Sequence, residues 1–421
     1  MRIRLPAGSL VLTIIIALIL SILSSALILI GYYNRLSYKT DEIKERVDRN
    51  FESTVNLVLS DTAIYQNDFT DSLDLFGEGS DSVKITKSLW GIFEIARIKS
   101  FYGKFFREEC FFYGTSMDGS LNACLYMADH QRPLSLVGET KLIGDAYLPK
   151  AGLKTSYIAQ RGFSSTKLID GSIKPSDQFL PVLNEEIKNN ITQLLEKRNI
   201  RTFNNGKANL FNKGSILNNF KDSTLIYTQD GNLVLTDLIL DGRVIIIASG
   251  LITVEPSAAL SNVILVASGI VFKTGFHGKV QAIGTDSIIV QNNCIFNYPS
   301  ALLLIKSESE ILQNRMIIGE GNNINGLLVS ICRNDDLYKS YVEIGNNTTF
   351  NGMIYSMGYL NLKTDITGIV LTDFFIYKTP SAIYENHLVD IEINRKNLSD
   401  YFLTSSIIRS DEKKGILQWV K

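Results

Sequence analysis

Few side chains in this sequence have the types and spacing that chemistry requires. The three histidines, His130, His277 and His387, are far apart, and none has a partner at helical or strand spacing. Catalytic and metal-binding histidines usually belong to spaced motifs, so we expect these three to be surface or packing residues. Neither a nucleophile elbow nor a glycine-rich phosphate-binding loop occurs. The sequence therefore predicts no metal site and no cofactor.

One group of carboxylates could act on polysaccharides. Arg333, Asp335 and Asp336 are the only mixed acidic and basic cluster in the later repeats of the chain. Two carboxylates can serve as acid and base on a glycosidic bond, although a polar corner explains these residues equally well. We expect no enzymatic activity, and a polysaccharide lyase or hydrolase is the alternative. A groove for an anionic sugar would carry more charge than residues 244–304, whose only charged residues are Glu255, Lys273, Lys279 and Asp286.

The four cysteines have no close pairing of the kind that zinc or redox motifs use. Cys110 and Cys124 lie symmetrically about Met117, beside the turn signal at Asp118 and Gly119. A β-hairpin here would bring the two thiols together as a disulfide in an oxidising compartment. Two ordinary buried thiols are the equal alternative.

Composition excludes two broad classes of protein. Lys and Arg together number 42 and Asp and Glu 43, so the chain lacks the basic excess of a nucleic-acid-binding protein. A hydrophobic fraction of 45% with almost no net charge is untypical of a disordered chain. The length of 421 residues predicts two or three domains.

An apolar stretch near the start of the sequence determines where the rest of the chain lies relative to a membrane. Residues 10–30 read LVLTIIIALILSILSSALILI, and no charge lies between Arg4 and Arg35. Such a run is long enough to cross a bilayer as one helix, and its hydroxyls can bond back to that helix. It is too long for the core of a cleaved signal peptide, and Tyr32 and Tyr33 follow it as interfacial aromatics do. We expect a single-pass membrane anchor, whose orientation the flanking charges do not decide.

The leader before this stretch has a distinctive form. MRIRLPAG is short and basic and ends at Gly8, directly before the apolar run. This N-terminus resembles those of type IV pilins and type II secretion pseudopilins, particularly PilX-like minor pilins and tip pseudopilins. The resemblance extends from Met1 to about Ser60. It implies cleavage after Gly8, a mature N-terminus at Ser9, and a helix that stays in the inner membrane or packs in a fibre core with other pilus-like or envelope subunits.

The resemblance is incomplete at one position. Most pilins carry Glu at the fifth mature position, where this chain has Thr13. Tip members of the family often lack that glutamate, so the departure fits a minor or capping subunit better than a repeating one. A plain signal anchor whose glycine is accidental is the alternative. Several Asp-Ser/Thr-aliphatic triplets, such as Asp286-Ser287-Ile288, resemble the O-glycosylation sites of exported Bacteroidota proteins.

The pattern of elements after the anchor changes several times. We expect a basic leader at 1–8, a transmembrane helix at 9–31, an amphipathic stalk helix at 32–62 and a linker at 63–86. A small β-rich domain at 87–178, containing an antiparallel sheet, and a capping helix at 179–200 should follow. The stalk has one apolar face, formed by Leu36, Ile43, Val47, Phe51, Thr54 and Val58. Val182, Ile187 and Ile191 share a face in the later helix, which we expect to cover the open end of the next domain.

Near-repeats dominate the later part of the chain. RVIIIASG at 243–250 recurs as NVILVASG at 262–269, and KVQAIG begins at Lys279. INGLLVS, FNGMIYS and ITGIVLT echo one another around Gly326, Gly352 and Gly368. Short strands recurring at about 20 residues predict a parallel β-helix, or solenoid, at 201–380. An antiparallel β-sandwich is the alternative. A C-terminal cap at 381–421 would then cover the last coil.

These observations predict the location of the protein and its fold, but they do not indicate a reaction that it catalyses. We expect a mainly β protein with an N-terminal membrane helix, whose C-terminal body is extracytoplasmic and whose partners are the lipid bilayer and other envelope subunits. Its expected role is a structural or interaction protein, a pilin-like minor subunit of a pilus or secretion apparatus. The alternative is a signal-anchored β-helix adhesin or enzyme that contacts glycan.

Overall fold

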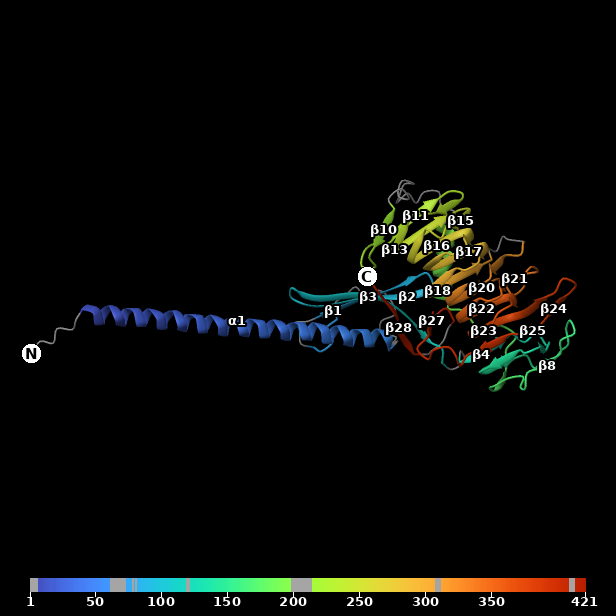
Figure 1. Ribbon diagram of the computed structural model, residues 1–421, viewed down its shortest axis with the longest axis horizontal. Coiled ribbons are helices and arrows are strands. Elements are labelled where there is room, and N and C mark those ends of the chain that lie inside the picture. Colours follow the sequence, from blue (N-terminus) through green and yellow to red (C-terminus); the bar gives the residue numbers. More distant parts are fainter. Residues whose placement is uncertain are drawn as a thin grey trace, which may run out of the picture. The chain divides into compact units, whose positions relative to one another are not determined.

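The computed structural model describes residues 7–60, 73–77, 79, 82–118, 122–197, 214–306, 312–408 and 413–421. These residues are mainly β, with one long apolar N-terminal helix, an antiparallel sheet and a large, chiefly parallel sheet (Figure 1). Two compact units divide the chain. Unit 1 comprises Met1–Val58, Ile64–Thr86 and Ile98–Glu108, and unit 2 comprises Leu59–Ala63, Lys87–Arg97 and Glu109–Lys421.

The helix α1 runs without a break from Ala7 to Leu59. Residues 10–39 are all exposed. Within the described part of the chain, α1 is the one helix long and apolar enough to cross a membrane. The Thr13 hydroxyl donates to the Leu10 carbonyl oxygen at 2.8 Å, as expected for a hydroxyl in an apolar helix. The expected transmembrane and stalk segments are therefore one continuous helix.

The second half of α1 has a buried face. Val47, Phe51 and Val58 are at most 4% exposed, which confirms the predicted amphipathic face in this part of the helix. Leu36, which the same periodicity placed on that face, is 48% exposed. Within unit 1, the Arg107 guanidinium lies 4.1 Å from the centre of the Phe51 ring. The boundary between exposed and buried apolar residues thus falls in the middle of α1.

An antiparallel sheet has the order β1-β2-β3-β27, and β28 also pairs with β3. A tight turn at Gly91 joins β1 to β2, with a φ of +62°. A Cβ at Gly91 would lie 2.0 Å from the Gln281 side-chain oxygen, which accepts a hydrogen bond from the Ile92 amide. This turn therefore contacts a strand of the parallel sheet directly. The strands are β1 (Ser82–Trp90), β2 (Phe93–Tyr102), β3 (Phe105–Ser116), β27 (Leu403–Thr404) and β28 (Lys414–Val420).

The later repeats form parallel ladders. Ile245 pairs with Ile264, and Ile264 pairs with Gln281, so the offsets between the near-repeats predicted the register. Successive near-repeats thus pair with one another in parallel. The strands are β10 (Ser215–Asn218), β11 (Leu225–Gln229), β12 (Leu233–Leu235), β13 (Ile239–Gly242), β14 (Val244–Ala248), β15 (Leu251–Val254), β16 (Ala259–Phe272), β17 (His277–Val290), β18 (Ile295–Ile305), β19 (Arg315–Ile318), β20 (Asn323–Ile331), β21 (Ser340–Ile344), β22 (Thr349–Leu362) and β23 (Ile366–Lys378).

A second chain segment continues the parallel ladders beyond β23. Leu125 pairs with Val370 in a parallel register, and Leu142 pairs likewise with Ile393. The sequence placed these short strands in a small β-rich domain with the antiparallel sheet, which is wrong because their partners come from the far end of the chain. The strands are β4 (Ala123–Met127), β5 (Leu134–Val137), β6 (Lys141–Ile143), β7 (Asp145–Leu148), β8 (Leu153–Thr155), β9 (Ile173–Pro175), β24 (Ile383–Glu385), β25 (His387–Val389) and β26 (Glu392–Asn394).

The tail after residue 380 has two roles rather than one. Strands β25 and β26 belong to the parallel arrangement, through β5 and β6. Strands β27 and β28 pair with β3 in the antiparallel sheet. The tail was expected to cover the last coil as a C-terminal cap. Instead, its strands pair with β5 and β6 in the parallel arrangement and with β3 in the antiparallel sheet.

Two apolar clusters follow from the alternation of side chains along the strands. Ile246 and Leu265 point into the cluster enclosed by the ladders, whereas Ile245 and Ile264 point outward into a second cluster. Helix α2 (Glu185–Glu196) contributes Ile187, Ile191 and Leu194 to this outward cluster. The helix therefore covers a sheet face. The sequence placed it over an open end, which is wrong because the helix packs on the outward isoleucines of the strands, such as Ile245 and Ile264.

Candidate functional site

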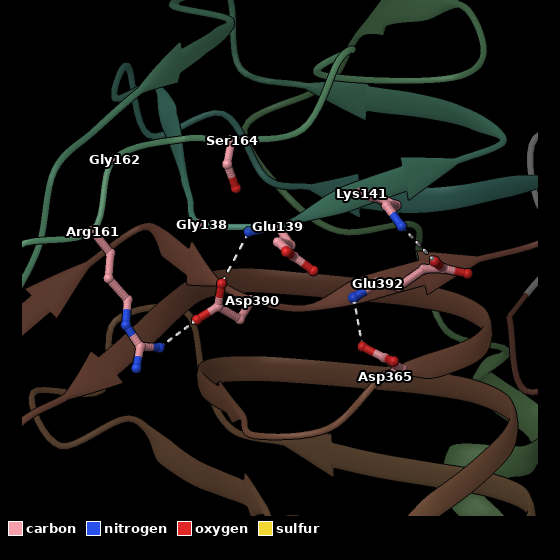
Figure 2. A pocket seen from close by; sticks show the side chains of 9 residues that line it. All are labelled: Gly138, Glu139, Lys141, Arg161, Gly162, Ser164, Asp365, Asp390 and Glu392. Atoms are coloured by element: carbon pink, nitrogen blue, oxygen red, sulfur yellow. Dashed lines mark hydrogen bonds and ion pairs between the residues drawn. The ribbon is translucent and has the colours of Figure 1, made fainter.

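A polar cleft of about 520 Å³ lies where the two chain segments of the parallel ladders meet. We call this contact, between β4, β5 and β6 on one side and β23, β25 and β26 on the other, the seam. Figure 2 shows that the lining side chains come from both segments. The lining residues are Gly138, Glu139, Lys141, Arg161, Gly162 and Ser164 from the first segment and Asp365, Asp390 and Glu392 from the second.

Asp390 is the residue around which the cleft is built. One carboxylate oxygen accepts a hydrogen bond from the Glu139 amide at 2.9 Å, and the other lies 2.7 Å from Arg161 Nη1. Gly138 has a φ of +66°, and a Cβ there would lie 1.8 Å from Asp390 Oδ1. Only glycine leaves room for the carboxylate at this position. The wall of the cleft is thus fixed by backbone as well as by charge.

The remaining charges of the cleft are partly paired. Asp365 Oδ1 accepts from the Glu392 amide at 2.7 Å, and Lys141 Nζ lies 3.9 Å from a Glu392 oxygen (Figure 2). Four carboxylates face two cations, so the cleft is rich in acceptors. Such a surface suits a ligand that carries many hydroxyl donors. Among the residues that the structure describes, no group of three or more His, Cys, Asp or Glu side chains could hold a metal ion.

A second, larger cavity of about 900 Å³ lies beside α2. Ile191 and Leu195 of the helix form one part of its lining, and another part is formed by Ile305 and Ile331, the last residues of β18 and β20, with Met357 inside β22. Charged side chains line it as well, including Arg333 and Asp335. The cavity is thus an apolar groove bordered by charged residues.

The cluster predicted from the sequence lies at this second cavity. Arg333 donates two hydrogen bonds to Asp335, at 3.0 and 2.6 Å, and its amide donates to Asp336 at 3.0 Å. The hydrogen bond from Arg333 lowers the pKa of Asp335. The side chains of Arg333 and Asp335 are 56% and 70% exposed. The three residues bind one another, as expected for the polar corner that the sequence analysis gave as the alternative to a catalytic cluster.

The three histidines have separate surroundings. His130 stacks on Phe374 with a centroid distance of 4.2 Å. His277 Nε2 lies 2.8 Å from the Asn297 amide nitrogen. His387 contacts Ser156 at 3.3 Å, and burial lowers its pKa.

The predicted disulfide between Cys110 and Cys124 does not form, and both residues are buried thiols. Cys110 lies in β3 opposite Val420 of β28, whereas Cys124 lies in β4, inside the cluster that the ladders enclose. The two strands pair with different partners and do not form the expected hairpin. Burial raises the pKa of Cys124 to about 12. The structure therefore matches the alternative of two ordinary buried thiols.

Gly8 and Ser9 lie in the first turn of α1. A Cβ at Gly8 would meet nothing within 4 Å, so packing does not require a glycine there. Cleavage between these residues stays a prediction.

Sequence reasoning missed the cleft residues. Glu139 and Asp390, whose contact builds the wall, are 251 residues apart. The local signal was weak, since Gly138 alone marked a turn. A second missed group joins Glu343 to Lys363 at 2.6 Å and to Asn361 at 3.0 Å. Its spacing of about one coil could have indicated it.

Comparisons with protein-family models, curated proteins and solved structures find no match to this chain.

Proposed function

We propose that this protein is a membrane-anchored, extracytoplasmic structural or interaction subunit with a pilin-like N-terminus. The observation that carries the proposal is the division of α1 into two halves. Residues 10–39 are exposed, and those from Leu10 to Ile30 are almost all apolar. The second half, with Val47, Phe51 and Val58, is buried on one face. The exposed apolar half of such a helix must be covered by lipid or by similar helices of other subunits. The other half packs against its own chain.

The burial argument explains why the first half needs a partner. Each large apolar side chain moved out of water is worth roughly 1.5–3 kcal/mol, and Leu10, Ile14, Leu18 and Ile22 are each more than half exposed. A bilayer removes this cost for a helix whose backbone groups are already paired. Packing against the same helix of other subunits would remove it as well. Both outcomes suit an inner-membrane protein that joins a pilus or secretion apparatus.

For the body we propose a parallel β-helix. The parallel registers of β10–β23 and the enclosed apolar cluster support it. The β-sandwich considered from the sequence would need antiparallel pairing between neighbouring strands, and these ladders are parallel. A solenoid of this kind presents long, regular faces, which suits a role in binding other subunits.

N-terminal mass spectrometry of the mature protein tests the pilin-like start. We expect a chain that begins at Ser9 and is N-methylated there. Gly8→Val should leave the leader uncleaved, whereas Gly31→Val should be processed normally. The pair is matched, because a Cβ at either glycine would meet nothing within 4 Å. A wild-type chain that begins at Met1 or Arg2 would remove the main support for the proposal, and full release into the aqueous fraction by carbonate would contradict the anchor.

A second candidate function is binding or cleavage of glycan, and the acceptor-rich cleft of Figure 2 favours it. Glu139 faces this cleft, and so does Ser164. Titration with neutral and acidic oligosaccharides would test it. We expect Glu139→Gln to weaken binding and Asp335→Asn, outside the cleft, to leave it unchanged. Equal binding by both variants would exclude the cleft as the glycan site.

A further inference from the structure

The first segment of the parallel ladders, residues 123–176, is built from very short strands. Strand β4 has five residues, β5 and β7 have four each, and β6, β8 and β9 have three each. Strands of this length are not stable without a neighbouring strand to pair with. Within the described part of the chain, their pairings outside the segment are to β23, β25 and β26. The segment thus depends on one edge formed by residues far along the chain.

Strands β4 and β23 are unequally supported where they meet, whereas β25 of the later segment has its described pairing with β5 of the first segment. Strand β23 pairs with β4 at three positions, Val370–Thr372, but pairs with β22 from Ile366 to Phe375. Losing the first segment would leave β23 supported by β22. Losing β23 would leave β4 paired with β7, a strand of four residues in the same segment. In a stacked array each unit is stabilised by its nearest neighbours, so a unit with one supported side is less stable than its neighbour with two.

The seam is apolar inside and charged at its rim. Leu125 and Leu136 of the first segment belong to the same enclosed cluster as Val370 and Leu388. Ion pairs cross the rim, at 3.0 Å between Arg132 and Glu385, 2.7 Å between Arg161 and Asp390, and 2.8 Å between Lys396 and Asp170. All are at least partly exposed, so salt screens them. The cleft of Figure 2 opens at the same rim.

We infer that residues 123–176 form a closing module, which joins the stack last during folding and opens separately from β22 and β23 in the native protein. Synthesis delivers the module before its template, since β23, β25 and β26 come later in the chain. The module must therefore wait without its later partners, with its own strands as neighbours, until Asn394 is available. This inference does not depend on the proposed membrane role.

Hydrogen exchange with mass spectrometry tests the direction of dependence in the full chain in detergent micelles. Three variants each remove a buried side chain: Leu125→Ala in the module, Phe375→Ala in its template, and Ile246→Ala in β14 as the matched control. We expect Leu125→Ala to raise exchange at 123–148 by about tenfold or more and to leave β23, residues 366–378, nearly unchanged. Phe375→Ala should raise exchange in both regions, and Ile246→Ala should leave 123–148 unchanged.

Two results would overturn the inference. One is equal acceleration of exchange at 123–148 and 366–378 by Leu125→Ala, and the other is acceleration at 366–378 alone by Phe375→Ala. If Phe375→Ala does not fold, pulse labelling of the refolding wild-type chain replaces it. Protection at 123–148 should then appear after protection at 366–378, and simultaneous or earlier protection at 123–148 would refute the order. In the native wild type, molar salt should accelerate exchange at 123–148 more than at 244–290.

Discussion

Replacing Gly352 with alanine should be among the most damaging single-methyl changes in the protein. Gly326, Gly352 and Gly368 lie opposite one another in three successive strands. Gly352 has a φ of +147°, and a Cβ there would lie 1.9 Å from the carbonyl oxygen of Gly326. The obstacle is backbone, so it cannot rotate away as a side-chain tip could. Backbone strain at a glycine-only conformation costs about 1–3 kcal/mol. Overpacking adds about 1–3 kcal/mol, which gives roughly 2–6 kcal/mol in all.

Urea unfolding of the detergent-solubilised chain, followed by tryptophan fluorescence, would measure this loss. Trp90 is 3% exposed and belongs to the same apolar cluster as Met353, the residue after Gly352. Gly231→Ala is the control, because Gly231 has a φ of +82° and a Cβ there would meet nothing within 4 Å. We expect the control to cost about 1 kcal/mol, from strain alone. A Gly352→Ala variant that loses no more stability than Gly231→Ala would refute the reasoning from close backbone approach.

Three further predictions concern groups already described. Burial lowers the pKa of His387 below its ordinary 6.5, so the unfolded state takes up protons first, and stability is full above pH 6.5 and falls as the pH drops toward the folded pKa. The protection factors at 123–148, which are corrected for the pH dependence of intrinsic exchange, should therefore fall below pH 6.5 in the wild type, and His387→Gln should reduce that fall. Cys124, with its pKa raised to about 12, should react with iodoacetamide in mildly alkaline buffer far more slowly than a free thiol, and rapid labelling in the folded protein would contradict its burial. Asp335→Asn should leave the urea midpoint unchanged, because the Arg333 pair is exposed, and a clear shift would show that this corner stabilises the fold.

The pairing of the later repeats was predictable because neighbouring parallel strands carry similar residues at matching positions. RVIIIASG and NVILVASG differ little, and their offset is the observed register of Ile245 and Ile264. Glycine recurs at 326, 352 and 368 for a physical reason, because at each position the backbone of the neighbouring strand occupies the space that a Cβ would fill. Where neighbouring strands meet the same packing requirement, their sequences resemble one another, and the pairing can be inferred from that resemblance.

The first segment was not predictable in this way. Its strands are short and resemble no later coil, so no repeat connects Leu125 with Val370. The turn signal at Asp118 and Gly119 suggested a local hairpin, but β3 finds its partners β27 and β28 at the far end of the chain. The cleft residues were missed for the same reason, because sequence patterns report local pairing and this site is assembled by contacts between distant segments.

The unequal lengths of the coils have a practical consequence. Ala301, Leu327 and Met353 follow one another in register, although the chain between them is longer than the chain that joins Ile245 to Ile264. Between Leu327 and Met353 the additional chain leaves the ladder at a bend, where Leu337 is 85% exposed. Foreign peptides such as epitopes or enzyme recognition tags could be grafted at this bend, and the scaffold would display them without realigning a single strand.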